Sequence, residues 1–152
     1  MRIISSIEEA LDAVGQDFGA SDWVTVGQDR IEAFADATGD HQWIHVDVER
    51  ARAESPYRST IAHGFLTLSL IPALSKANYR VDNAKMGINY GLNKVRFLAP
   101  VPAGSRVRVR SELIDAAKVD DSTVDLTVRH TVELDGSAKP AAVAELIARM
   151  VF

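Results

Sequence analysis

The sequence predicts an α+β fold in which an antiparallel β-sheet wraps around a long buried central helix. In the first part of the 152-residue chain, apolar residues recur at helical spacing, whereas after residue 85 they alternate with polar residues as in strands. Between these parts, apolar residues from Phe65 to about Tyr79 surround nearly the whole helical circumference, which is typical of a buried helix. Helices followed by an antiparallel meander favour the α+β class, with the buried helix across the concave face of the sheet.

Short elements are expected before the buried helix. Ser6 begins a capping box, and the helix that follows it should stop near Gly15. A short strand is expected over residues 22–26 and a second helix over residues 28–38, ending near Gly39.

A further short helix and the sheet complete the expected elements. Asp47 can cap a helix through about Arg52, and Pro72 should kink the buried helix or end it early. Asp135-Gly136 marks a turn between strands. The residues expected on the inner face of the strands are Val107, Val109, Ser111, Val124, Leu126, Val128, Val132, Leu134, Ala144, Leu146, Ala148 and Met150.

Composition narrows the class of protein. The formal net charge of −4 disfavours a nucleic-acid-binding role, since such domains are usually basic. The chain has no cysteine, which excludes disulfides, thiolate nucleophiles and cysteine-based metal sites and is compatible with the cytoplasm. No apolar run approaches the roughly 20 residues of a membrane span, and no secretion signal is expected. The length fits a single domain over residues 1–152.

Two neighbouring motifs carry the chemistry. Asp40 and His45 lie five residues apart in an expected loop, where their side chains can converge on one water molecule. His63-Gly64 then opens the most apolar helix, whose free N–H groups can stabilise a developing oxyanion. From spacing alone, Asp40 is better explained as a turn or capping residue and His45 as a hydrogen-bonded loop histidine. The combination favours addition or removal of water beside a carbonyl.

Two stretches carry a family resemblance. The chain resembles the MaoC-like, (R)-specific enoyl-CoA hydratase family in Phe34-x₃-Thr38-Gly39-Asp40-x₃-Ile44-His45-x₅-Ala51 and in the downstream Ala62-His63-Gly64. The similarity covers about residues 20–152. One departure is that Gln42-Trp43 replaces the usual Asn-Pro, a variant similar to members grouped with nodulation protein N.

The resemblance implies a fold, an activity and a site. It implies a single hot-dog domain and the reversible hydration of trans-2-enoyl thioesters to (R)-3-hydroxyacyl thioesters. It assigns catalysis to Asp40 and His45, with the Gly64 N–H as oxyanion donor. The substrate would be an acyl-CoA or acyl-carrier-protein thioester, with no separate cofactor and no metal, and the protein would be a homodimer. The residues expected to contact substrate are Trp43, His63, Phe65 and Arg96.

Several roles remain open from the sequence. Trp43 either lines the acyl channel or fills the space that proline would leave, and His63 either contacts substrate or only shapes the helix start. Lys94 and Arg96, and the stripe formed by Arg106, Arg108 and Arg110, either contact CoA phosphates or form a solvated surface.

His130 is expected to be a hydrogen-bonded core histidine, and His41 is expected to face solvent. The alternative functions are a hot-dog thioesterase, which the full Asp–His motif argues against, and a non-catalytic acyl-CoA-binding or partner subunit.

Overall fold

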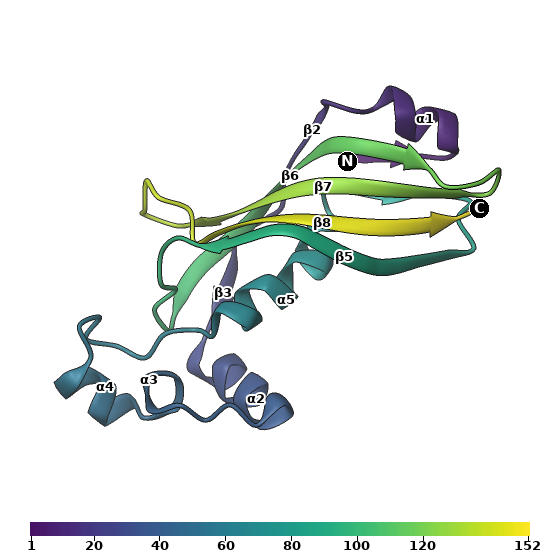
Figure 1. The fold of residues 1–152 in the computed structure, drawn as a ribbon. Coiled ribbons are helices and arrows are strands. Elements are labelled where there is room, and N and C mark those ends of the chain that lie inside the picture. Colours follow the sequence, from purple (N-terminus) through teal and green to yellow (C-terminus); the bar gives the residue numbers. More distant parts are fainter.

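The computed structural model describes residues 1–152 and has a six-stranded antiparallel sheet as its main layer (Figure 1). Its four long strands are β5 (Met86–Phe97), β6 (Ser105–Lys118), β7 (Thr123–Leu134) and β8 (Ala142–Val151). Two short strands, β2 (Asp17–Ala20) and β3 (Val24–Val26), both pair with the outer edge of β6. The α+β class is therefore confirmed. Strand β2 was not expected from the sequence.

The strand order corrects the expected meander. Strands β6, β7 and β8 do follow one another, but β5 pairs with β8 at the far edge, so the order is β2-β6-β7-β8-β5. The segment after β5 must therefore cross from one side of the sheet to the other. Every residue of β5 except Val95 is exposed. The open edge of the sheet is thus a long strand rich in exposed apolar side chains.

Helix α5 (Gly64–Ser75) packs against β6, β7 and β8, as Figure 1 shows, and its buried face carries Leu66 and Ile71. The opposite face exposes Phe65, Ser69 and Pro72. The expectation of a helix buried on all sides was therefore wrong for the single chain. The apolar stripe on the exposed side has no partner within this chain.

Helix α5 is also shorter than expected, because the chain leaves it after Ser75. Residues Tyr79–Val81 instead form β4, which pairs in parallel with β1 (Arg2–Ile4) at the start of the chain. Neither strand was expected from the sequence. Helix α1 (Ile7–Asp12), capped by Ser6 as expected, contacts β6 and β7 and covers the second of two apolar clusters.

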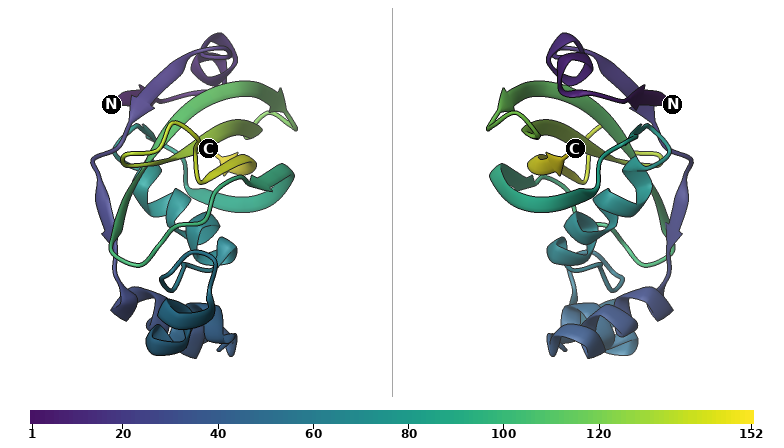
Figure 2. Two further views of the ribbon diagram at one scale, coloured as in Figure 1. Left: turned by 90° about the vertical axis from the view of Figure 1, so that its left-hand side faces the viewer. Right: turned by 90° about the vertical axis from the view of Figure 1, so that its right-hand side faces the viewer.

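The remaining helices gather at the N-terminal end of α5, away from the sheet (Figures 1 and 2). They are α2 (Gln28–Thr38), α3 (Trp43–Val46) and α4 (Val48–Glu54). The expected end of α2 is confirmed, because Gly39 caps it with φ of 80°, a left-handed conformation that favours glycine. Asp47 caps α4 by accepting a hydrogen bond from the Arg50 N–H, also as expected. None of the helices is both long and apolar enough to cross a membrane.

Candidate active site

The turn after α2 positions the carboxylate of Asp40. Gly39 reverses the chain, Asp40 follows it on the surface, and the single turn of α3 then presents His45. The expectation of one loop was therefore wrong for His45, which lies in a helical turn. The Asp40 Oδ1 accepts a hydrogen bond from the Gln42 N–H at 3.3 Å, which restrains the side chain within the turn. The acid is therefore exposed at a rigid turn, one short helical turn away from the imidazole.

His45 is buried and has a defined tautomer. Its Nδ1 lies 2.7 Å from the Ile61 carbonyl oxygen, which can only accept, so Nδ1 carries the proton. Burial lowers the pKa of His45 below its usual value of 6.5, which favours the neutral ring. Nε2 therefore carries a lone pair and can act as a base. Gln28 on α2 holds the backbone of the same residue by donating to the His45 carbonyl oxygen at 2.8 Å.

His63 supports both members of the Asp40–His45 pair. Its Nε2–H donates to the Asp40 carbonyl oxygen at 2.9 Å, and its ring stacks on the His45 ring with a centroid separation of 3.8 Å. Phe34 packs at 5.0 Å from the same ring. The structure therefore gives His63 a defined contact with the acid turn and with the imidazole. The sequence motif alone left open whether this residue touches substrate or only shapes the helix.

The three polar side chains form one cluster. A carboxylate oxygen of Asp40 and one ring nitrogen each of His45 and His63 lie within 4.8 Å of one another. Two hydrogen bonds of ordinary length can span such a gap through one water molecule. The geometry is poorly suited to a shared zinc ion, because the stacked rings are only 24° from parallel. Their in-plane lone pairs do not converge on a point about 2 Å from both nitrogens.

Gly64 begins α5, and the N–H groups of Gly64, Phe65 and Leu66 donate no hydrogen bond within the chain. A Cβ at Gly64 would lie 3.1 Å from the Phe97 ring, so glycine permits this ring to pack against the start of the helix. Gly64 and Phe97 line a cavity of about 310 Å³ together with Thr67. A free N–H at the positive end of a helix thus borders a mostly apolar cavity.

The other residues predicted to contact substrate lie outside the cluster of Asp40, His45 and His63. Trp43 lies under the Arg50 guanidinium at 4.3 Å and lines none of the larger cavities. Phe65 is 69% exposed, with its ring 6.3 Å from that of Phe97. Arg96 is exposed at the end of β5 and bonds only to the Val95 carbonyl, so its charge has no acidic partner. The structure brings Asp40, His45, His63 and Gly64 together, with Trp43 and Arg96 at the margin.

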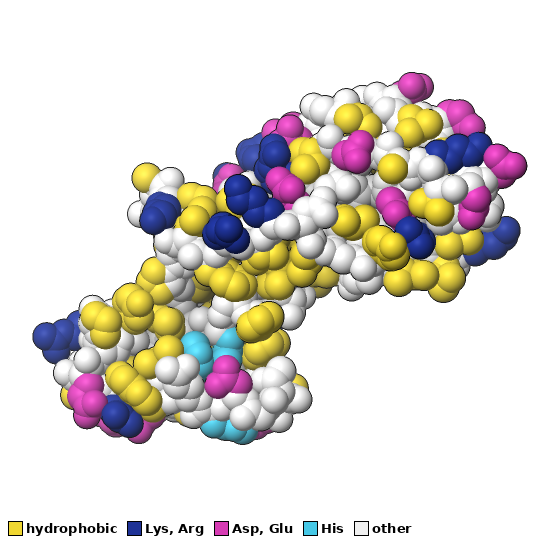
Figure 3. Space-filling view, viewed as in Figure 1, with side chains coloured by type: hydrophobic (Ala, Val, Ile, Leu, Met, Phe, Trp, Pro, Cys, Tyr) yellow, Lys and Arg dark blue, Asp and Glu magenta, His cyan; other side chains and the backbone are white.

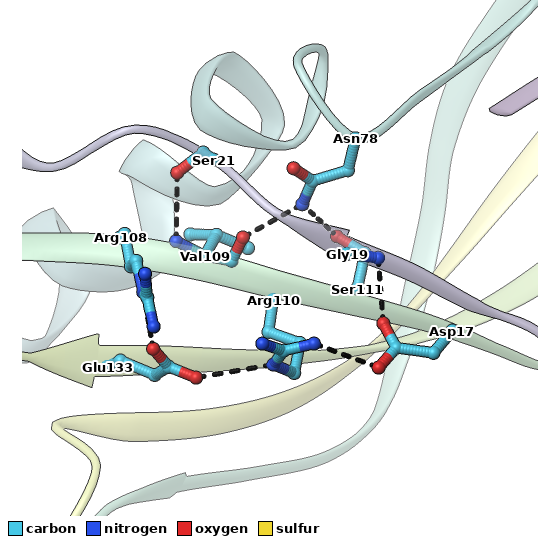
Figure 4. A network of polar contacts seen from close by, with 9 residues as sticks. All are labelled: Asp17, Gly19, Ser21, Asn78, Arg108, Val109, Arg110, Ser111 and Glu133. Carbon is cyan, nitrogen blue, oxygen red and sulfur yellow. Dashed lines mark hydrogen bonds and ion pairs between the residues drawn. The ribbon is translucent and has the colours of Figure 1, made fainter. Parts of the chain in front are cut away.

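The arginine stripe on β6 is neutralised within the chain. Arg106 pairs with Asp135, Arg108 pairs with Glu133, and Arg110 bridges Glu133 and Asp17. Figure 4 shows the chain of contacts from Arg108 through Glu133 and Arg110 to Asp17. Internal pairing makes this stripe a solvated surface network, whereas Arg96 keeps an unpaired charge. His41 is exposed as expected and pairs with Asp36 at 2.8 Å.

Comparison with known proteins identifies the family. The MaoC like domain model matches residues 9–134. The chain is 56% identical to a Mycobacterium tuberculosis protein named 3-hydroxyacyl-thioester dehydratase Z, over 99% of both chains. It is 45% identical to nodulation protein N of Rhizobium leguminosarum bv. viciae, covering 97% of this chain and 92% of the relative.

A solved R-hydratase from Pseudomonas aeruginosa in its unliganded form superposes with a TM-score of 0.69 at 25% identity, covering 89% of this chain and 79% of that chain. The hot-dog fold expected from the sequence is thereby confirmed. The chain belongs to the MaoC-like dehydratase family.

Proposed function

We propose that this protein catalyses the reversible hydration of trans-2-enoyl thioesters to (R)-3-hydroxyacyl thioesters. The observation that carries the proposal is the pairing of an exposed carboxylate, Asp40, with a buried imidazole, His45, whose Nε2 is unprotonated. The names of the similar dehydratase and R-hydratase support the same reaction class and stereochemistry.

In the proposed reaction, one water molecule lies between the Asp40 carboxylate and His45 Nε2. His45 takes a proton from this water as its oxygen adds to C3 of the enoyl group, and the imidazolium returns the proton to C2. Asp40 accepts the other hydrogen of the water, which orients the attacking oxygen. Dehydration follows the same steps in reverse.

The thioester oxygen gains negative charge during this addition. The free Gly64 N–H at the start of α5 is the proposed donor to that oxygen, supported by the helix macrodipole. The unpaired charge of Arg96 is proposed to meet phosphate groups of CoA or of the carrier-protein prosthetic group. These residues perform the reaction in the proposal without a separate cofactor or metal ion.

The test is the loss of the enoyl absorbance of crotonyl-CoA on addition of purified protein. Asp40→Asn should abolish most of this activity, whereas Asp36→Asn, which removes another exposed carboxylate four residues away, should not. Release of free thiol would instead indicate a thioesterase. No reaction by a folded protein, across chain lengths, would favour a non-catalytic subunit.

We further propose a homodimer, supported by the unpaired apolar surface along β5 and the outer face of α5. Ile88, Tyr90 and Leu92 on β5 are 41%, 57% and 47% exposed in the single chain. An open strand of this length is normally paired or covered. Leu92→Glu should yield a monomer by light scattering, while Val119→Glu, at a similarly exposed site outside β5, should not. A monomeric wild-type protein would exclude the dimer.

We propose a cytoplasmic location, which the absence of cysteine and the CoA-type substrate support. The chain is proposed to act as one domain over residues 1–152.

A further inference from the structure

A second cavity lies at the other end of α5 from Gly64. It has a volume of about 410 Å³ and lies between the C-terminal half of the helix and the sheet, with β4 and the first half of β5 as further walls. Most of its inner surface is apolar. The residues that form this apolar surface include Pro72, Tyr79, Val128, Leu146, Ala148 and Met150.

Among the polar residues that line the cavity, Lys76, Arg80, Lys85 and Asn89 are exposed, whereas Ser75 and His130 are buried. His130 lies on β7, in the sheet wall of the cavity. The residue is 1% exposed, and burial lowers its pKa to about 4, so the ring is neutral at physiological pH. The sequence indicated only that it would be a hydrogen-bonded core residue, and the structure confirms that its Nδ1 lies 3.0 Å from Ser111 Oγ.

The hydrogen bonds around Ser111 determine which nitrogen of His130 carries the proton. Asn78 Nδ2 donates to Ser111 Oγ at 2.8 Å and also donates to the Val109 carbonyl oxygen at 2.8 Å (Figure 4). Ser111 Oγ accepts from Asn78, and its own buried hydrogen has no acceptor within the chain other than His130 Nδ1, so the hydroxyl donates to Nδ1. A neutral imidazole that accepts at Nδ1 carries its proton on Nε2.

The Nε2–H of His130 therefore needs an acceptor that the protein does not supply. Two fully buried side-chain atoms lack a hydrogen-bond partner, His63 Nδ1 and Asn78 Oδ1. His130 Nε2 also has no partner in the protein but is not one of these fully buried atoms. It is therefore accessible rather than sealed in the core. Since His130 lines the cavity, this donor faces the cavity space. A ligand that fits must be mainly apolar and must present an oxygen to this N–H.

A neighbouring cavity extends this one along α5 towards Gly64. A further cavity of about 300 Å³ between α5 and strands β5 and β8 is lined by Leu68 and Leu92, and it shares Pro72, Asn89 and Leu146 with the larger one. Hydrophobic side chains gather along the lower side of the molecule in Figure 3. Gly64 and Pro72 are eight residues apart on α5, which corresponds to about 12 Å at the helical rise. This span matches an extended acyl chain rather than a short one.

We propose that the cavity under the C-terminal half of α5 binds the distal part of an oxygen-bearing acyl chain, with His130 Nε2–H donating a hydrogen bond to a neutral hydroxyl or keto oxygen on it. This inference rests on the proposed function, because it takes the thioester end of the same chain to lie at Gly64. It assigns the protein a preference for acyl thioesters oxygenated far from the thioester group.

Equilibrium binding tests the proposal without requiring turnover. Calorimetric titration compares dodecanoyl-CoA with ω-hydroxydodecanoyl-CoA, two saturated thioesters that cannot be hydrated. Wild-type protein should bind the hydroxylated chain roughly tenfold more tightly, as expected for one added hydrogen bond in a mainly apolar cavity. His130→Phe should reverse this preference, because the hydroxyl group would then be buried without a partner. His130→Gln, whose amide can donate from a similar place, should restore it in part.

The outcomes separate this inference from the proposed function. Equal binding of both ligands by the wild type, or an unchanged preference in a folded His130→Phe variant, would overturn the inference even if crotonyl-CoA is hydrated. A preserved preference without crotonyl-CoA hydration would support the cavity and reject the reaction. If His130→Phe does not fold, proton NMR of the wild type decides. The Nε2–H resonance absent from His130→Gln should shift with the hydroxylated ligand and not with the plain one.

Discussion

A buried neutral histidine lies near each end of α5, His45 in α3 and His130 in β7, and the two are protonated on opposite nitrogens. At the start of the helix, His45 donates from Nδ1 to the Ile61 carbonyl oxygen, which leaves Nε2 as a base. Near its C-terminal end, His130 accepts at Nδ1 from Ser111, which leaves Nε2–H as a donor. In the two proposals above, the same type of side chain transfers a proton at one end and recognises a ligand at the other. The type of partner at Nδ1 decides between the two roles.

The surroundings of the two histidine rings also differ, being polar at His45 and mainly apolar at His130. His45 lies beside an exposed carboxylate and is stacked on a second imidazole. His130 lies among apolar side chains with a hydroxyl and an amide behind it. A histidine alone in a sequence therefore says little about chemistry until its partners are known.

The largest expected effect is at the His45 end. His45→Ala should lower kcat for crotonyl-CoA by about 10²–10⁴-fold, with a much smaller change in KM, because it removes the base without removing the thioester contacts. Adding Asp40→Asn should cost little more, since both residues act on one water. His41→Ala is the control, being an exposed histidine of the same turn. Near-normal turnover by folded His45→Ala would show that the base lies elsewhere.

The second prediction concerns His130 and the pH dependence of the free energy of unfolding. The pKa of His130 is about 4 in the folded protein and 6.5 in the unfolded chain, so the unfolded state binds the extra proton between these values. Stability from this residue is complete above about pH 6.5 and is lost as pH falls towards 4. Urea unfolding should show that the wild type loses about 3 kcal/mol more than His130→Gln over this interval. Parallel curves for the two proteins would mean that His130 is not buried neutral.

The third prediction tests whether Trp43, near the start of α5, determines the preference for acyl-chain length. Trp43 packs under Arg50 and lines none of the larger cavities, so Trp43→Ala should lower the free energy of unfolding by on the order of 2 kcal/mol, less than for a fully buried tryptophan. The ratio of activities on short and long enoyl-CoA substrates should stay the same. A shift of that ratio towards longer or branched chains, without loss of stability, would instead place the acyl channel at Trp43.

The smallest effect concerns His63 as a positioning residue. His63→Ala should lower kcat about tenfold, because Asp40 loses the hydrogen bond to its carbonyl and His45 loses its stacking partner. The nearby His63 ring helps to lower the pKa of His45, so the acidic limb of the pH–rate profile should move to higher pH in this variant. His63→Gln, which can still donate to the carbonyl, should recover part of the rate. An unchanged pH profile would leave His63 with a packing role only.

Local signals in the sequence were sufficient for α1, α2 and α4, but not for α3, whose residues were expected to form a loop. The ends of α2 and α4 and the cap of α1 depend on residues such as Gly39, Asp47 and Ser6, which act on backbone groups within a few positions. Periodicity identified the inner faces of β6 and β7 in the same way. Family motifs identified Asp40, His45 and Gly64 as the proposed site residues. These features were accessible because each is encoded by neighbours in the chain.

Features that depend on distant residues were not predicted. The pairing of β5 with β8, the short strands β1 and β4, and the exposed face of α5 all depend on contacts between segments far apart in sequence. The anchoring of His45 by Gln28 and the hydrogen bond from His63 to Asp40 are also long-range.

The sequence by itself therefore determined the fold class, the family and the residue types available for the chemistry. Only the tertiary structure decided the protonated nitrogen of each buried histidine, because that depends on whether an acceptor such as the Ile61 carbonyl or a donor such as the Ser111 hydroxyl meets Nδ1. Side-chain periodicity tells which residues face inward, but hydrogen-bond direction follows from the partners that the fold brings to them.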